Sequence, residues 1–77
     1  MPHFTGTAEL NAMIDRVAPD VLALLADGVP RTKAAIVEAL AGRHPADEVG
    51  LTLARLAVTG RVVETSGRYT LPAPEAA

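Results

Sequence analysis

The sequence predicts a mainly α-helical α+β domain that ends in a small β-hairpin. Three observations support this fold class. Apolar residues recur at helical spacing in successive segments, glycines stand where those segments end, and the composition turns β-rich after Gly60. The 77 residues are enough for one small domain and too few for a second. We therefore expect residues 1–77 to form a single domain around one core.

The first expected element is an added N-terminal helix over residues 7–18, preceded by a flexible lead over residues 1–6. Thr7 can cap this helix. Apolar residues recur along it and beyond it at intervals of three and four, at Leu10, Ile14, Val17 and Val21. Such a stripe requires a partner surface, which predicts that the helix packs against the rest of the domain.

Pro19 interrupts this pattern because proline lacks the backbone N–H that a helix interior needs. We therefore expect a kink or a break near Ala18, with Pro19 in the first turn of a second segment that runs to Asp27. Residues 19–71 are then the main core of the domain. Residues 72–77 lack periodicity and are expected to form a disordered tail.

Two more helices are expected in the middle of the chain. Residues 29–31 form an extended connector that could add a third strand to the hairpin, and Thr32 offers a cap for a helix over residues 33–41. Gly42 stands where a left-handed glycine ends a helix, and Pro45 fits the first turn of the next one.

The last helix and the hairpin follow each other without a gap. Val49, Leu53 and Leu56 repeat at helical spacing, and Gly60 can take the left-handed conformation that closes a helix. Residues 61–65 are β-rich, the chain can turn at Ser66 and Gly67, and residues 68–71 return as the second strand. We expect Tyr69 to pack this hairpin against the helices.

The motifs VxxxLxxL at Val49, TGRVV at Thr59 and GRYTL at Gly67 resemble the winged helix-turn-helix superfamily from Val21 to Leu71. The resemblance implies a winged helix-turn-helix with an extra N-terminal helix. It further implies that the second helix of the motif enters the major groove of DNA. The hairpin, called the wing, is then expected to contact phosphates. Similar runs occur in transcription regulators, in the C-terminal winged domain of DNA-processing proteins and in the dimerisation domains of O-methyltransferases. The last two are not primarily DNA readers.

Charge is unevenly distributed along the chain. The formal net charge is −2, yet residues 31–68 carry six basic and four acidic side chains, a balance of +2. Residues 1–30 carry one basic and four acidic side chains, a balance of −3. The expected motif and wing are therefore the one positive region, and six side chains are candidates for DNA contact: Lys33, Arg55, Arg61, Arg68, Thr52 and Arg31.

Each candidate also has a simpler explanation. On a helical wheel with Val49 at 0°, Arg55 and Thr52 lie at roughly 240° and 300°, on the flank of the outward face. Arg55 could instead pair with Glu48 or Asp47 of its own helix. Arg61 and Arg68 could pair with Glu64 across the hairpin. Lys33 and Arg31, at the start of the first motif helix, could serve solubility alone.

The centre of the outward face favours protein over DNA. Leu51, Ala54 and Val58 fall at roughly 140° to 200° and form an apolar stripe. We expect the N-terminal helix, a second copy of the chain or another protein to cover it. For a homodimer, the expected interface uses Leu10, Ile14 and Val17.

Catalytic and metal chemistry find no support. His3 and His44 are the two histidines and have no ligand-spaced carboxylate, and Ser66 has no histidine and aspartate placed to activate it. We expect no cofactor and no metal. The N-terminus has neither the basic nor the apolar region of a signal peptide, the apolar stretches are too short to span a membrane, and cysteine is absent. We therefore expect a soluble, cytoplasmic protein.

The leading hypothesis is a small non-enzymatic, transcription-regulator-like protein that binds duplex DNA as a homodimer. The alternative is a module for protein–protein interaction or dimerisation that uses the outward apolar face of the second motif helix. A dimerisation domain detached from a larger enzyme is a third possibility.

Overall fold

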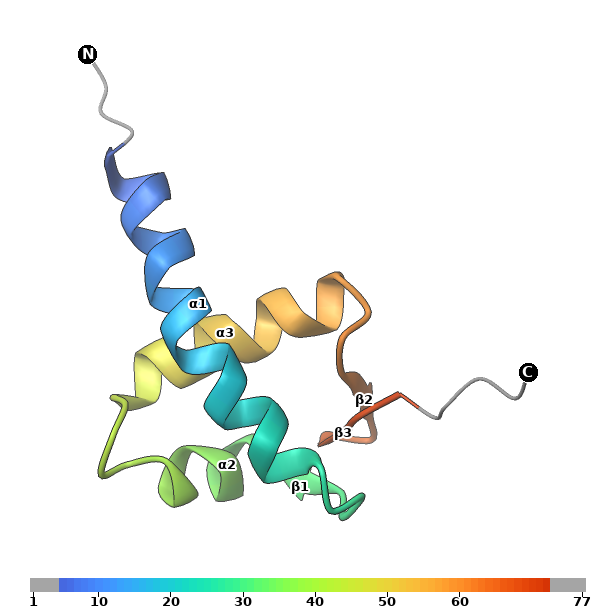
Figure 1. Ribbon diagram of the computed structural model, residues 1–77. Helices are drawn as coiled ribbons and strands as arrows, with labels where there is room; N and C mark the ends of the chain where they lie inside the picture. Colours follow the sequence, from blue (N-terminus) through green and yellow to red (C-terminus); the bar gives the residue numbers. More distant parts are fainter. Residues whose placement is uncertain (1–4, 73–77) are drawn as a thin grey trace.

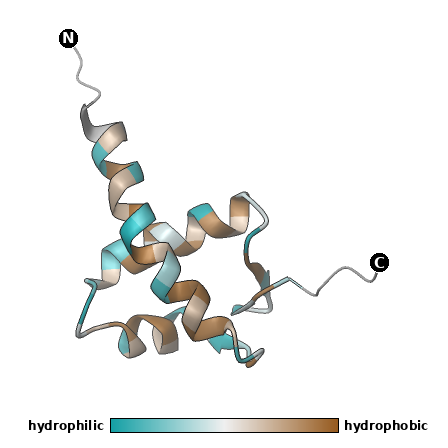
Figure 2. Ribbon diagram, viewed as in Figure 1, coloured by the Kyte–Doolittle hydropathy of each residue, from teal (hydrophilic) through white to brown (hydrophobic). Residues whose placement is uncertain are grey.

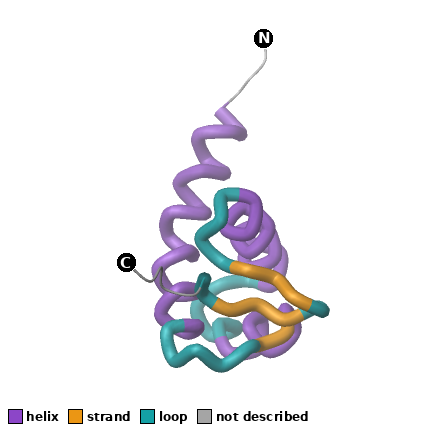
Figure 3. The backbone as a smooth tube through the Cα atoms, turned by 90° about the vertical axis from the view of Figure 1, so that its right-hand side faces the viewer, coloured by secondary structure: helices purple, strands orange, loops and turns teal. Residues whose placement is uncertain are grey.

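The computed structural model describes residues 5–72, with side chains described for residues 8–72. It contains three helices and a three-stranded antiparallel sheet (Figures 1 and 3), which confirms the predicted fold class. The order of elements is compatible with a winged helix. In chain order, they are α1 (Thr5–Leu25), β1 (Arg31–Thr32), α2 (Lys33–Ala39), α3 (Ala46–Val58), β2 (Val63–Thr65) and β3 (Arg68–Thr70).

Helix α1 is continuous, so of the two outcomes expected near Ala18, a kink or a break, the break is wrong. The helix begins at Thr5, upstream of the predicted cap at Thr7, and runs through Pro19 to Leu25. Pro19 lies on the exposed side, where the Asp15 carbonyl that loses its helical partner can reach water. Buried residues on both sides of Pro19 hold the two halves on one core. The expected lead over residues 1–6 overlaps this helix at residues 5 and 6, and its remainder lies outside the described residues, as does most of the expected tail.

A tight turn leads from α1 to the first strand. The helix ends at Leu25 rather than Asp27, and Gly28 takes the left-handed conformation (φ +80°) while its N–H donates to the Leu25 carbonyl. Strand β1 then pairs with β3, which confirms the expected third strand. The Thr32 hydroxyl accepts a hydrogen bond from Ala35 N at 3.1 Å, and this confirms the expected cap of α2.

The turn between α2 and α3 differs from the predicted one. Helix α2 ends at Ala39 instead of residue 41, and the left-handed cap predicted at Gly42 is wrong because the backbone of Gly42 does not have a positive φ. The N–H groups of Arg43 and His44 both donate to the Leu40 carbonyl and close the turn. Pro45 is the N-cap of α3 rather than its first residue.

The end of α3 and the hairpin follow the prediction. Gly60 is left-handed (φ +79°), and the Arg61 N–H reaches back to the Leu56 carbonyl at 2.8 Å. Ser66 and Gly67 both have positive φ, 52° and 80°, as a two-residue hairpin turn of this twist requires. Strand β3 lies between β1 and β2, and Tyr69 is half-buried against the core as predicted.

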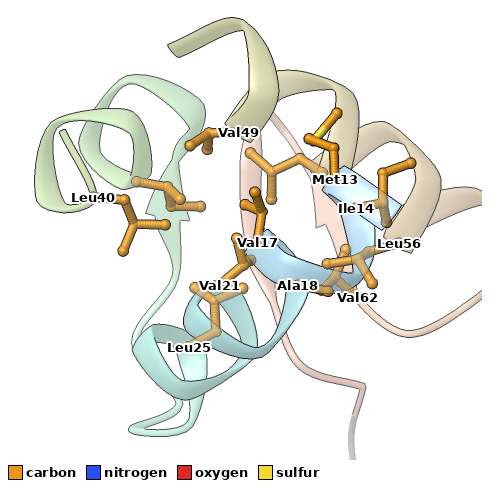
Figure 4. Packing of buried hydrophobic residues seen from close by; sticks show 12 residues of the cluster. Met13, Ile14, Val17, Ala18, Val21, Leu25, Leu40, Val49, Leu56 and Val62 are labelled. Atoms are coloured by element: carbon orange, nitrogen blue, oxygen red, sulfur yellow. The ribbon is translucent and has the colours of Figure 1, made fainter. Parts of the chain in front are cut away.

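The core lies between α1, α2 and α3, with Val62 just before β2 closing it (Figure 4). The predicted core face of α3, Val49, Leu53 and Leu56, is almost completely buried. Helix α1 crosses α3 and continues toward α2 and β1 (Figure 1), and its C-terminal half is mostly hydrophobic (Figure 2). Half of the buried cluster comes from this helix, at Met13, Ile14, Val17, Ala18, Val21 and Leu25. No helix within residues 5–72 is both long and apolar enough to cross a membrane.

Candidate functional site

An apolar groove lies between the N-terminal half of α1 and the outward face of α3. Its volume is about 250 Å³. Leu51 is 51% exposed and Val58 is 85% exposed, so the wheel placed the predicted stripe correctly. The groove is lined by Leu10, Ile14, Leu51, Ala54, Arg55 and Val58. Tertiary packing thus places the apolar stripe of α3 beside Leu10, a half-buried residue of α1.

Helix α1 covers only one flank of α3. On this flank the Thr52 hydroxyl lies 3.7 Å from the Met13 sulfur, and Arg55 Nη1 donates to Asn11 Oδ1 at 3.2 Å. The two helices diverge beyond their crossing (Figure 1), and Leu51 and Val58 remain open to solvent. The N-terminal helix therefore covers the edge of the apolar stripe and leaves its centre uncovered.

Two sets of predicted site residues are buried in the core. Thr52 is completely buried and donates its hydroxyl to the Glu48 carbonyl at 2.8 Å, so its predicted DNA contact is wrong. Ile14 is 7% exposed and Val17 is fully buried, so they pack within the chain instead of forming the expected dimer interface. The helical wheel could not predict the burial of these residues, because their burial depends on where α1 packs. Of the three expected dimer residues, Leu10 remains partly accessible at the groove.

Arg31 is bound within the fold. Its guanidinium donates twice to the Asp27 carboxylate, at 2.9 and 2.8 Å, and once to the Leu24 carbonyl. The hydrogen bonds that Arg31 donates to Asp27 raise the pKa of Arg31, and the Arg31 guanidinium together with the Val29 N–H lowers the pKa of Asp27 to about 2. This pair fastens the end of α1 to β1, so Arg31 is not available as the phosphate ligand that was predicted.

This ion pair predicts a specific acid sensitivity. Because the folded pKa of Asp27 lies below the ordinary value of 3.8, the pair stabilises the fold fully above about pH 4 and its contribution is lost as the pH falls toward 2. We expect Asp27→Asn to lower the melting temperature at pH 6 and to flatten its fall between pH 4 and 2, measured by circular dichroism. Asp15→Asn, at an exposed position of α1, is the control. An equally steep fall in both variants would contradict the assignment.

Four predicted cations make no ion pair with any described residue: Lys33, Arg55, Arg61 and Arg68. The alternative ion pairs expected for them do not form. Arg55 binds Asn11 rather than Glu48 or Asp47, and the Glu64 carboxylate accepts the Gly67 N–H at 2.8 Å instead of pairing across the hairpin.

Three of these cations lie on or beside the sheet and the start of α2. Arg68 begins β3 and is paired in register with Thr32, the residue before Lys33. The side-chain end of Lys33 passes close to Gly50, within 3.1 Å of where a Cβ there would lie. Arg61 is exposed in the link between α3 and β2. Lys33 and Arg68 therefore start from neighbouring positions of the chain, whereas Arg61 lies at the opposite end of the hairpin from Arg68.

The surface of this region is less positive than the sequence indicated. Arg31 pairs with Asp27 in the turn after α1, and Arg43 pairs with Asp20 of α1, which leaves four cations in residues 31–68 beside the four acidic side chains there. None of those four carboxylates forms an ion pair with a described residue. The unpaired side chains of residues 31–68 therefore carry no net charge, in contrast to the balance of +2 counted from the sequence. A polyanion would be favoured only where the cations are locally grouped.

A cluster centred on Asp20 had no sequence signal because its members are more than twenty positions apart. His44 Nε2 lies 2.7 Å from one carboxylate oxygen of Asp20, and Arg43 Nη1 lies 3.3 Å from the other. The hydrogen bond with His44, with a smaller contribution from Arg43, lowers the pKa of Asp20. The cluster ties the turn between α2 and α3 to α1.

No family model, curated protein or solved structure matches this chain. The class of protein is therefore described from the structure alone. It is a small α+β domain of three helices and a C-terminal hairpin, with an apolar groove beside its third helix. Within residues 5–72, no three histidine, cysteine or carboxylate side chains gather as a metal site would require.

Proposed function

We propose that this chain is a winged helix-turn-helix protein of the cytoplasm that binds duplex DNA, is transcription-regulator-like and is not an enzyme. The observation that carries the proposal is that Arg61 and Arg68 lie at the two ends of the hairpin, with Lys33 at the start of α2, next to the residue that pairs with Arg68. These cations have no carboxylate partner among the described residues, and the order of helices and strands matches the motif.

Phosphate contact, rather than base reading, fits these residues. The outward face of α3 presents Leu51, Ala54 and Val58, which offer no hydrogen-bond donors to a base edge. Arg55 is turned toward Asn11 at the rim of the groove. A wing that contacts phosphates gives weak binding without sequence preference, and its affinity falls steeply with salt.

Reversing the charge of the wing tests this proposal. We expect Arg61→Glu combined with Arg68→Glu to weaken binding to random duplex DNA at least about tenfold at low salt, measured by fluorescence anisotropy. The dependence of log affinity on log salt should also become shallower by about two units.

The matched control changes net charge equally at a distance from the wing, with Arg16→Glu and Arg43→Glu. It should retain most of the affinity. Equal losses in both variants would show that only net charge matters, and no binding by the wild type at low salt would refute the proposal.

The groove favours a second candidate function, protein–protein interaction through α3. Leu51→Asp would then remove a protein contact and leave DNA binding intact. Because Leu51 is half exposed, this substitution should not unfold the domain.

A further inference from the structure

Lys33 carries a charge that the local structure of α2 does not explain. It is the first residue of this helix, where the partial positive charge of the helix end disfavours a cation, and the first turn holds no acidic side chain to offset it. Its ammonium forms no ion pair with any described residue. The charge of Lys33 therefore stabilises neither its own helix nor a carboxylate in the part of the chain that the structure describes.

Gly50 is equally unfavourable where it stands. It lies in the interior of α3, where glycine destabilises a helix relative to almost every other residue because its backbone loses the most freedom on folding. The backbone of Gly50 does not have a positive φ, so its conformation does not require glycine. A reason for glycine at this position must therefore come from what lies against it.

The residue that lies against Gly50 is Lys33. A Cβ at Gly50 would be 3.1 Å from Lys33 Cε and 3.3 Å from Lys33 Nζ, which is closer than an ordinary van der Waals contact. Apart from the adjoining backbone of α3, these are the atoms within 4 Å of that position. The end of the lysine side chain therefore occupies the space that a side chain at position 50 would fill.

The contact determines where the charge of Lys33 is presented. On the helical wheel with Val49 at 0°, Gly50 lies at roughly 100°, between the core face and the outward face of α3. A lysine side chain loses conformational freedom when it binds a ligand, and it loses less if it already lies against a helix. Two residues that each break a local preference thus meet in one contact, which is typical of a functional site.

We propose that Gly50 is a positioning residue for Lys33: the missing side chain lets the lysine lie against α3 and holds its ammonium beside the outward face of that helix, in position to contact a phosphate of duplex DNA. This inference rests on the proposed function. It goes beyond that function because it assigns a role in DNA binding to an uncharged residue of α3.

Filling the space at Gly50 tests the positioning role. Leucine favours a helix more than glycine does, so Gly50→Leu should keep α3 intact and displace Lys33 without changing the net charge. We expect binding to random duplex DNA at low salt to weaken about threefold to tenfold, measured by fluorescence anisotropy. The dependence of log affinity on log salt should become shallower by about one unit, because one phosphate contact is lost.

Gly42→Leu is the matched control. A Cβ at Gly42 would have nothing within 4 Å, and its φ is not positive, so this variant should bind DNA like the wild type. Equal weakening in the two variants would overturn the proposal. Melting temperatures would verify that each variant is folded.

A double-mutant cycle tests whether Gly50 acts through Lys33. Lys33→Ala should weaken DNA binding by a factor similar to that of Gly50→Leu. The two substitutions combined should bind no more weakly than Lys33→Ala alone, because the displaced charge is already absent. Losses that multiply in the combined variant would show that Gly50→Leu acts on DNA directly, and they would overturn the positioning role.

A measurement without DNA separates this inference from the proposed function. The wild type should show a nuclear Overhauser effect between Hα of Gly50 and Hε of Lys33, which is the only lysine of the chain. Absence of this effect would overturn the positioning role even if the protein binds DNA. A wild type that shows the effect but binds no DNA at low salt would refute the proposed function, and with it the phosphate contact of Lys33, while the contact with Gly50 would stand.

Discussion

Leu53→Ala is expected to lower the free energy of unfolding by about 3 kcal/mol. Leu53 is 1% exposed at the centre of α3 and belongs to the cluster shared with α1 and α2, so the truncated side chain leaves a cavity that its neighbours cannot fill without moving. A domain of this size has a total stability of about 4 to 12 kcal/mol. The variant should therefore retain only about 1 to 9 kcal/mol and unfold at a lower urea concentration.

The measurement is urea denaturation followed by circular dichroism, with Leu51→Ala as the control. Both substitutions remove the same atoms from the same helix, but Leu51 is half exposed, and its loss should lower the free energy of unfolding by about 1 kcal/mol or less. Equal losses would mean that α3 presents a different face to the core from the one described.

Pro19→Ala is expected to raise the free energy of unfolding by about 1 to 3 kcal/mol. The alanine N–H can donate to the Asp15 carbonyl, which restores the helical hydrogen bond that proline omits from the interior of α1. Pro19 is exposed, so little buried surface is lost with its ring. The prediction is checked by thermal and urea denaturation.

Pro30→Ala is the matched control, because Pro30 is also exposed but lies outside the helices. There the substitution should change stability by no more than about 1 kcal/mol, in the destabilising direction, by loosening the unfolded chain. A loss of stability on Pro19→Ala would indicate that the geometry imposed by proline is needed to seat both halves of α1 on the core.

The two proposed surfaces assign different tasks to different elements. DNA contact would depend on the wing and the start of α2, whereas protein–protein interaction would depend on the groove between α1 and α3. Arg55 belongs to the second surface because it lines the groove and is bonded to Asn11. In this division, the third helix would bind protein through its apolar outward face while the hairpin bound phosphates.

The sequence by itself determined the elements whose cause is local. The core face of α3, the cap at Thr32, the left-handed Gly60 and the hairpin turn at Ser66 and Gly67 are each encoded within a few residues, through helical periodicity, side-chain capping or tolerance of positive φ. The stripe that lines one wall of the groove was visible for the same reason.

Only the tertiary structure decided which of the candidate side chains remain accessible. The contacts of Thr52 with Met13, Arg55 with Asn11 and His44 with Asp20 join residues 39, 44 and 24 positions apart. Helical periodicity predicts the face on which a residue lies but not the element that packs against it. The position of α1, continuous through Pro19, therefore buried Thr52 and Val17, bound Arg31 to its C-terminal turn, and formed the groove beside α3.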